Sequence, residues 1–294
     1  MDRLKDNIDK QIEFNKGKNL FAGGAGRALR FIQETAAIIE DPGGISESEV
    51  SLLVDYATEK ALQEFCRVNQ YFAFDAPAQQ ELRKIYAALF TKIRAHKYDA
   101  ESLSEAHYQN LKQWLKAANP FSEKVYSDKG PELEPVACAE YSPELQLGIL
   151  RVSAAPFMEP ILDIGCGKEG SLVAHLRSQG IEAYGLDRFA AEAPYLTKGD
   201  WLEFNFGKNK WGTLISNLGF SNHFNHHHFR EDGNYIAYAK KYMDILHSLK
   251  TGGCFYYAPG LPFIEQYLDE QEYLVVGREI EGYDFKAAAV KRLK

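Results

Sequence analysis

A glycine-rich turn between a predicted strand and a predicted helix is the feature of this sequence that most limits its fold. The apolar run Ile161–Ile164 ends in the turn GCGKEG at 165–170, and helical periodicity begins directly after it. Glycines at this spacing let the backbone turn sharply and leave space for a ligand against the helix N-terminus. The turn lies in a strand-helix-strand unit that ends at Asp187. In this context the pattern predicts a ligand-binding turn at the edge of a parallel sheet. A purely structural turn is the alternative.

The charges around the turn favour one class of ligand. Asp163 lies two residues before the first glycine, where its carboxylate would repel a pyrophosphate. S-adenosylmethionine has no phosphate, and acidic neighbours favour its ammonium and sulfonium groups. Asp187 can accept from ribose hydroxyls, and Asp200, which follows the expected third strand with Trp201 beside it, can accept from an adenine amino group. Three acids and no phosphate-binding lysine motif therefore predict S-adenosylmethionine as cofactor.

The C-terminal half resembles the class I S-adenosylmethionine-dependent methyltransferases over about residues 141–294. The motifs that carry the resemblance are DIGCG at 163–167, GLD at 185–187, GDW at 199–201, LISN at 214–217 and LKTGGC at 249–254. One departure is Glu169-Gly170, since the commonest pattern of the family has glycine one position earlier. Another is the segment NLGF at 217–220, which lacks the proline-aromatic motif of amino methyltransferases that act on DNA bases. This second departure counts against adenine or cytosine N-methylation.

The resemblance implies a role for each motif. Asp163 and the two glycines after it would hold the methionine and sulfonium end of the cofactor. Asp187 would hold the ribose, and Asp200 with Trp201 the adenine. The predicted cofactor site consists of Asp163, Gly165, Cys166, Gly167, Asp187, Arg188, Asp200, Trp201 and Asn217.

Strands and helices alternate through the C-terminal half and end in a short connection, EGYD at 281–284, between two β-type segments. This pattern predicts an α/β fold: a doubly wound, mostly parallel sheet with a terminal antiparallel hairpin, the Rossmann-like methyltransferase fold. The predicted elements are a helix from Pro143, strand 160–164, helix 170–179, strands 182–186 and 212–216, helix 234–249, strand 253–258, helix 262–269, and the hairpin strands 273–280 and 285–293.

The first 118 residues show helical periodicity and no β-type alternation, and Ser46 with Glu49 forms a capping box at one helix start. Prolines and a glycine in 119–140 predict a linker or long loop. We therefore expect an α-helical domain over 1–135 and a cofactor-binding domain over 136–294. The first domain would act as a lid or acceptor platform. Its aromatic residues, expected to form its core and in part an acceptor pocket, include Tyr71, Phe72, Phe74, Tyr86 and Phe90.

A histidine-rich stretch, SNHFNHHH at 221–228, follows the fourth strand. His223 is nearest to the strand end and, with an ordinary pKa near 6.5, is the candidate catalytic base or acceptor contact. His223 and His227 would share a helix face, which allows a metal site, but no carboxylate or cysteine stands at a convincing ligand spacing. No metal site is therefore predicted. A polar loop without chemistry is the alternative.

Composition excludes several classes of partner. The net charge is −7, with 34 Lys and Arg against 41 Asp and Glu, which disfavours binding to nucleic acid. The four cysteines form no CxxC pair, so a zinc ribbon or a disulfide framework is not expected. The N-terminus carries frequent charges, and no apolar run approaches the length of a membrane span. We expect a cytoplasmic protein without membrane or nucleic-acid partners.

Together these features predict S-adenosylmethionine-dependent methyl transfer to a small or medium organic acceptor. Methyl transfer is an in-line displacement on an activated sulfonium, so the protein would mainly align the reactants and exclude water. Two alternatives are a nicotinamide-dependent oxidoreductase and a non-catalytic protein that binds S-adenosylmethionine.

Overall fold

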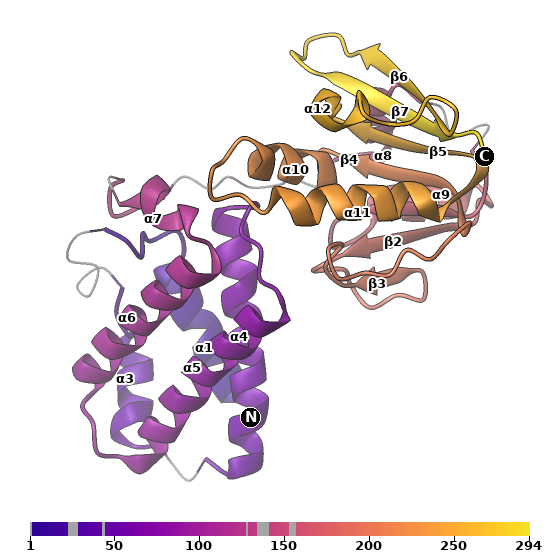
Figure 1. Cartoon of the computed structure of the whole chain (residues 1–294). Coiled ribbons are helices and arrows are strands. Elements are labelled where there is room, and N and C mark those ends of the chain that lie inside the picture. Colours follow the sequence, from indigo (N-terminus) through magenta and orange to yellow (C-terminus); the bar gives the residue numbers. More distant parts are fainter. Residues whose placement is uncertain (1, 23–28, 43–44, 128, 134–140, 153–156) are drawn as a thin grey trace. The chain divides into compact units, whose positions relative to one another are not determined.

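The computed structural model describes residues 2–22, 29–42, 45–127, 129–133, 141–152 and 157–294. The chain divides into two units, Met1–Cys138 and Ala139–Lys294 (Figure 1). The domain boundary expected between residues 135 and 136 falls within 134–140, outside the described residues. Each unit contains a hydrophobic core of its own.

Unit 1, Met1–Cys138, is built from amphipathic helices with side-chain caps. Ser46 Oγ accepts from the Glu49 N–H at 3.3 Å, and Glu49 Oε2 accepts from the Ser46 N–H at 3.0 Å, which confirms the predicted capping box. Asp75 and Asp99 cap the next two helices by accepting from the N–H three residues further on. The helices are α1 Asp2–Asn15, α3 Gln33–Glu40, α4 Glu47–Val68, α5 Ala76–Ala95, α6 Ala100–Ala118 and α7 Phe121–Tyr126.

Helix α7 lies inside the segment predicted as a linker or long loop, so that prediction was wrong for this part. Pro120 occupies the N-cap of α7, where a missing N–H removes no helical hydrogen bond. Phe121 and Tyr126 are buried, so the segment belongs to the packed part of unit 1. Among the described helices of the whole chain, none has both the length and the apolarity needed to cross a membrane.

Unit 2, Ala139–Lys294, contains a mixed sheet with the strand order β3-β2-β1-β4-β5-β7-β6. Strands β1 to β5 are parallel, and β7 runs antiparallel between β5 and β6. This is the strand order of the class I methyltransferase fold, so the predicted fold class is confirmed. The elements are α8 Pro143–Leu150, β1 Ile161–Ile164, α9 Ser171–Ser178, β2 Ala183–Asp187, β3 Leu196–Lys198, β4 Trp211–Asn217, α10 Phe220–His228, α11 Tyr235–Ser248, β5 Leu249–Ala258, α12 Pro262–Glu265, β6 Tyr273–Glu279 and β7 Lys286–Arg292.

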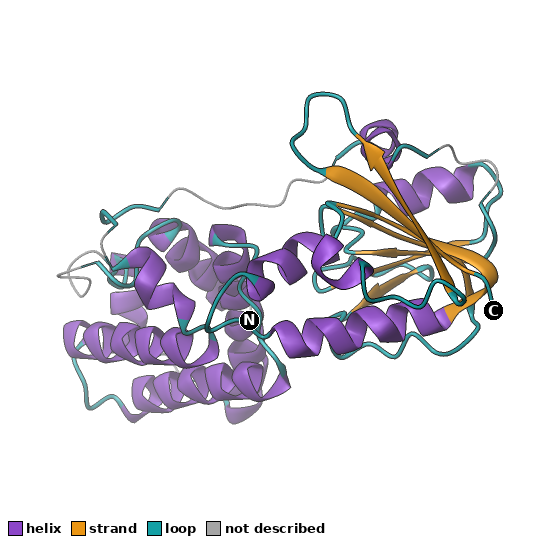
Figure 2. Ribbon diagram, turned by 45° about the horizontal axis from the view of Figure 1, so that its top comes forward, coloured by secondary structure: helices purple, strands orange, loops and turns teal. Residues whose placement is uncertain are grey.

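Helices cover both faces of this sheet (Figure 2). Side chains alternate along the strands: Ile161 and Ile215 pack with α8 and α9, whereas Leu162 and Leu214 pack with α10 and α11 on the other face. The direction of the strand order reverses between β1 and β4, which are neighbours although β2 and β3 separate them in the chain. In doubly wound sheets, ligands bind outside the carboxyl ends of the strands at such a switch point.

Three elements of unit 2 differ from their predicted extent. The histidine-rich segment forms helix α10, because Phe220 and Phe224 recur at helical spacing and are buried. Strand β5 begins at Leu249, four residues earlier than predicted. Helix α12 ends at Glu265, because the Tyr267 N–H bonds back only three residues, to the Ile264 carbonyl.

Candidate functional site

The glycine turn after β1 folds back against β2 at the switch point of the sheet. Gly165 and Gly167 have φ angles of +82° and +79°, which residues with a side chain rarely adopt. The Gly165 N–H donates to the Leu186 carbonyl at 2.8 Å. A Cβ atom on Gly165 would lie 3.1 Å from Cζ3 of Trp201. Backbone conformation and crowding therefore both favour glycine at position 165.

The side chain of Cys166 points into the protein interior. It is buried in the cluster formed with Ile161 and Leu172 on the α8 and α9 face of the sheet. A Cβ atom on Gly185 would lie 2.6 Å from its Sγ, so the glycine of the GLD motif makes room for this sulfur. The Cys166 side chain therefore has a packing role, and a ligand in the turn would meet its backbone.

Two buried polar side chains stand at the carboxyl ends of β1 and β4. Asp163 is 1% exposed and Asn217 is 8% exposed. Among the described residues, Oδ2 of Asp163 has no hydrogen-bond partner, and neither does Oδ1 or Nδ2 of Asn217. Asp163 is in register with Ile215, so Asn217 lies two residues further along the neighbouring strand, at the same edge. Since buried polar atoms are almost always paired, this edge provides unused acceptors and one unused donor for a ligand.

The electrostatics of this edge favour a cationic group. Burial raises the pKa of Asp163 to about 7, and the nearby Asp187 adds to the rise. Asp187, at the end of β2, accepts from the Gly167 N–H at 3.3 Å and from the Phe189 N–H at 2.8 Å. These bonds hold its carboxylate against the glycine turn. A cation bound here would favour the charged form of Asp163.

Asp200 and Trp201 follow β3, as predicted. Oδ1 of Asp200 accepts from the Leu202 N–H at 2.8 Å. Burial raises the pKa of Asp200, although this hydrogen bond and the Arg188 cation oppose the rise. Trp201 approaches Gly165, as described above, and meets the ring of His223 edge-on, with 4.8 Å between ring centroids. Trp201 therefore lies where the loop after β3 comes together with the glycine turn and α10.

His223, on α10, is buried rather than exposed at the protein surface. It is 3% exposed, and its Nδ1 lies 3.4 Å from the Tyr238 hydroxyl. Burial, with smaller contributions from Arg188 and His227, lowers the pKa of His223 well below 6.5. The ordinary pKa assumed from the sequence was therefore wrong, because burial disfavours the imidazolium form. His223 is neutral at neutral pH.

The next histidines of α10 pack against aromatic rings. His227 stacks on Tyr238 with 4.8 Å between centroids, and His228 stacks on Phe263 with 3.7 Å. Nδ1 of His227 accepts from the Asn234 N–H at 3.2 Å. In the part of the chain that the structure describes, no group of three or more His, Cys, Asp or Glu side chains is arranged to hold a metal ion.

Ser216 is a site residue that sequence reasoning missed. Its buried Oγ donates to the Ile164 carbonyl at 2.8 Å and accepts from the Phe220 N–H at 3.0 Å. One hydroxyl thus links the ends of β1 and β4 to the start of α10. Because Ile164 is 52 residues away in the chain, no local sequence signal indicates this contact.

Comparison with known proteins gives likeness at the level of fold. No protein-family model matches the sequence, and no curated protein matches it. The C-terminal half matches many solved structures of S-adenosylmethionine-dependent methyltransferases. A TehB-like S-adenosylmethionine-dependent methyltransferase from Corynebacterium glutamicum is 18% identical, with 47% of this chain and 82% of that chain covered and a TM-score of 0.34.

Two other similar solved structures are named for different methyl acceptors. The 1,6-didemethyltoxoflavin-N1-methyltransferase of Burkholderia thailandensis, solved with S-adenosylhomocysteine, is 16% identical over 46% of this chain and 71% of that chain, with a TM-score of 0.32. An rRNA methylase from Streptococcus thermophilus is 13% identical over 54% of this chain and 100% of that chain, with a TM-score of 0.36. These TM-scores are below 0.5, so the fold assignment rests on the strand order of this chain's own sheet.

Proposed function

We propose that this protein transfers a methyl group from S-adenosylmethionine to a small or medium organic acceptor. The observation that carries the proposal is that buried Asp163 Oδ2 and the buried side-chain amide of Asn217, beside the glycine turn, have no hydrogen-bond partner among the described residues. The methionine end of the cofactor has an ammonium group that donates hydrogen bonds and a carboxylate that accepts them. Asp163 Oδ2 and Asn217 Oδ1 can accept from the ammonium, while Asn217 Nδ2 can donate to the carboxylate. The donor and acceptor atoms of Asp163 and Asn217 therefore match those of the methionine end of the cofactor.

The remaining cofactor contacts follow from the same edge of the sheet. In this proposal Asp187 binds the ribose hydroxyls, Asp200 accepts from the adenine amino group and Trp201 flanks the adenine. Gly165 and Gly167 have positive φ angles, which favour glycine over residues with a side chain. Because glycine has no side chain, the backbone of the turn can lie close to the ligand. A dinucleotide would instead place its pyrophosphate near two carboxylates, which disfavours the oxidoreductase alternative.

The bound cofactor would supply an activated methyl group, so this chain's residues chiefly have to align the acceptor and exclude water. We propose that unit 1 acts as the lid or acceptor domain, since all the residues of the proposed cofactor site belong to unit 2. We also propose that His223 contacts the acceptor. As a neutral imidazole, it is already in the form that can accept a proton or a hydrogen bond.

The cofactor assignment is tested by calorimetry with S-adenosylhomocysteine on Gly165→Ala and Gly180→Ala. Both glycines have φ of +82°, so the two substitutions impose similar backbone strain. A Cβ atom on Gly180 meets nothing within 4 Å, whereas one on Gly165 contacts Trp201. We expect binding to be weakened by Gly165→Ala and retained by Gly180→Ala, with unchanged circular dichroism in both.

Two results would contradict the proposal. Equal affinity in the two glycine variants would show that the ligand lies elsewhere, and tight binding of NADH by the parent protein would favour the oxidoreductase. Binding of S-adenosylmethionine without methyl release to any organic acceptor would support the non-catalytic alternative.

A further inference from the structure

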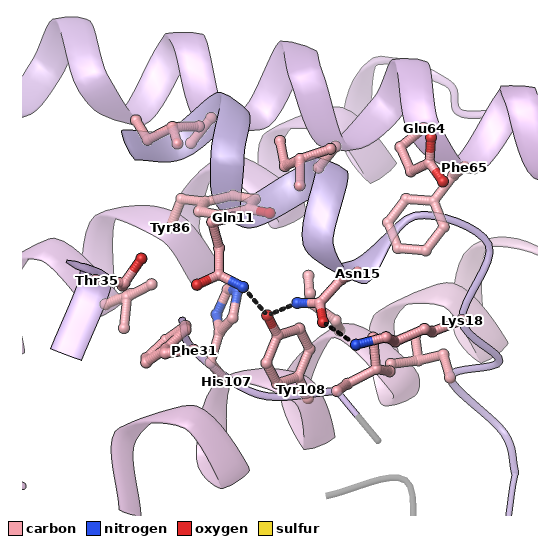
Figure 3. A pocket seen from close by; sticks show the side chains of 18 of the residues that line it. Gln11, Asn15, Lys18, Phe31, Thr35, Glu64, Phe65, Tyr86, His107 and Tyr108 are labelled. Atoms are coloured by element: carbon pink, nitrogen blue, oxygen red, sulfur yellow. Dashed lines mark hydrogen bonds between the residues drawn. The ribbon is translucent and has the colours of Figure 1, made fainter. Parts of the chain in front are cut away.

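Unit 1 contains an apolar cavity of about 170 Å³ that belongs to no part of the proposed cofactor site (Figure 3). Side chains from α1, α3, α4, α5 and α6 line it. Three of the aromatic residues singled out from the sequence also line it: Tyr86 and Phe90 on α5, and Phe72 in the segment between α4 and α5. Since a cavity of about 150 Å³ with an apolar lining holds one benzene molecule, this space matches a single substituted ring.

One wall of the cavity is a buried histidine with an unpaired ring nitrogen. His107, on α6, is 6% exposed, and its Nδ1 has no hydrogen-bond partner among the described residues. Its ring lies 5.1 Å from that of Tyr86 and 5.9 Å from that of Phe31, measured between centroids. Burial lowers the pKa of His107 to about 4, so the ring is neutral. Burying a ring nitrogen without a hydrogen-bond partner in this apolar setting costs free energy, and a polar ligand group could pair it.

Tyr108, whose ring centroid lies 5.3 Å from that of His107, has a hydroxyl hydrogen that no described residue accepts. The side-chain amides of Gln11 and Asn15 both donate to this oxygen (Figure 3). Their orientation is set by other bonds: Gln11 Oε1 accepts from the Ile32 N–H at 2.9 Å, and Asn15 Oδ1 accepts from Lys18 Nζ at 3.3 Å. A phenol oxygen accepts two hydrogen bonds and donates one. Both acceptor positions are filled, and no described residue accepts the hydroxyl hydrogen.

The two charged side chains in the lining already have partners. Lys18 donates to Asn15, and Glu64 accepts from Arg67 at 2.7 and 2.8 Å. The charge of Glu64 is balanced by Arg67, whereas Lys18 Nζ bonds to a neutral amide and lies 3.6 Å from the centroid of the Phe14 ring. The other lining side chains are uncharged, so burying a charged ligand among them would be costly. The occupant should be neutral.

We propose that this cavity binds a neutral, mainly apolar molecule of the size of one substituted aromatic ring, carrying one hydroxyl group. The ligand hydroxyl would accept from the Tyr108 O–H and donate to His107 Nδ1, and so would pair both unused groups. The body of the ligand would contact the surrounding apolar side chains. This proposal does not rest on methyl transfer, because it assigns a binding site within unit 1 alone.

The test is calorimetry of the full-length protein with 4-methylphenol and with p-xylene, which replaces the hydroxyl by a methyl group of similar size. We expect 4-methylphenol to bind several-fold to about tenfold more tightly, the usual effect of one or two neutral hydrogen bonds. His107→Phe and Tyr108→Phe keep an aromatic ring at each position and should remove this preference while p-xylene still binds. Equal affinity for both compounds in the parent, or no binding of 4-methylphenol, would overturn the proposal.

A second pair of variants locates the binding. Ala61 lines the cavity, and Ala61→Leu should fill it, raise the melting temperature and abolish binding of both compounds. Ala88→Leu makes the same change on an exposed position of α5 and should leave binding intact. Binding of 4-methylphenol that survives Ala61→Leu would place the ligand elsewhere and refute the proposal. The affinity for S-adenosylhomocysteine should be unchanged in every one of these variants. A negative result for 4-methylphenol can therefore be told apart from a failure of the methyltransferase proposal.

Discussion

Replacing Asp163 with asparagine is expected to make unit 2 more stable than the parent as the pH rises, and to weaken cofactor binding. In the folded protein, burial and the neighbouring Asp187 raise the pKa of Asp163 from 3.8 to about 7. The folded state therefore retains a proton that the unfolded state has already released. Because the native state holds more protons over this range, the free energy of unfolding of the parent falls as the pH increases from 4 to 8. An amide has no such proton to lose.

The magnitude follows from the size of the shift. A pKa raised from 3.8 to about 7 corresponds to about 4 kcal/mol of unfolding free energy over the whole titration. Between pH 5 and pH 8 the stability difference between Asp163→Asn and the parent should therefore grow by about 2 to 3 kcal/mol. The variant also loses an acceptor for the ammonium group of the cofactor, so higher stability should accompany lower affinity.

The assay is urea denaturation at several pH values in a Trp114→Phe background. The remaining tryptophans, Trp201 and Trp211, both lie in unit 2, so their fluorescence reports on that unit alone. Asp284→Asn makes the same chemical change at an exposed position and should follow the parent at every pH. Parallel pH curves for Asp163→Asn and the parent would refute the reasoning. Calorimetry adds a second measurement: near pH 6.5, cofactor binding should release protons in the parent but not in Asp163→Asn.

Three other perturbations test neighbouring parts of the structure. His223→Ala should lower turnover by about 10²- to 10⁴-fold with nearly unchanged cofactor affinity, and parental turnover in the variant would exclude a base at this position. Since burial lowers the pKa of His223, turnover of the parent at saturating cofactor should fall only when the pH drops below 6.5. Ser216→Ala removes both hydrogen bonds of a buried hydroxyl and should cost about 1 to 3 kcal/mol in urea denaturation, so an unchanged midpoint would contradict its linking role. The fragment 136–294 should bind S-adenosylhomocysteine but lose methyl transfer, and transfer at the parental rate would refute the lid role of unit 1.

Much of the architecture of the candidate site could be predicted because its signals are local. Glycines with strand residues before them and helical periodicity after them can form few structures other than the turn at 165–170. Parallel strands place their carboxyl ends at one edge, so acids that follow strands, such as Asp187 and Asp200, are expected on the same side of the sheet. The terminal hairpin was predictable for a similar reason, since a short connection between two β-type segments requires antiparallel pairing.

Protonation states and unpaired polar atoms depend instead on residues that are distant in the chain. From the sequence, His223 is expected to titrate as an ordinary histidine. In the structure it is buried against rings such as that of Trp201, and burial together with the nearby Arg188 charge lowers its pKa. His107 reads as one polar residue on an amphipathic helix, and only the packing of several helices places its nitrogen in an apolar cavity. Backbone preferences and periodicity act over a few residues, so the order and type of the elements can be inferred from the sequence. Desolvation and hydrogen-bond pairing are set by every group nearby in space, and these groups come together only when the helices and strands pack.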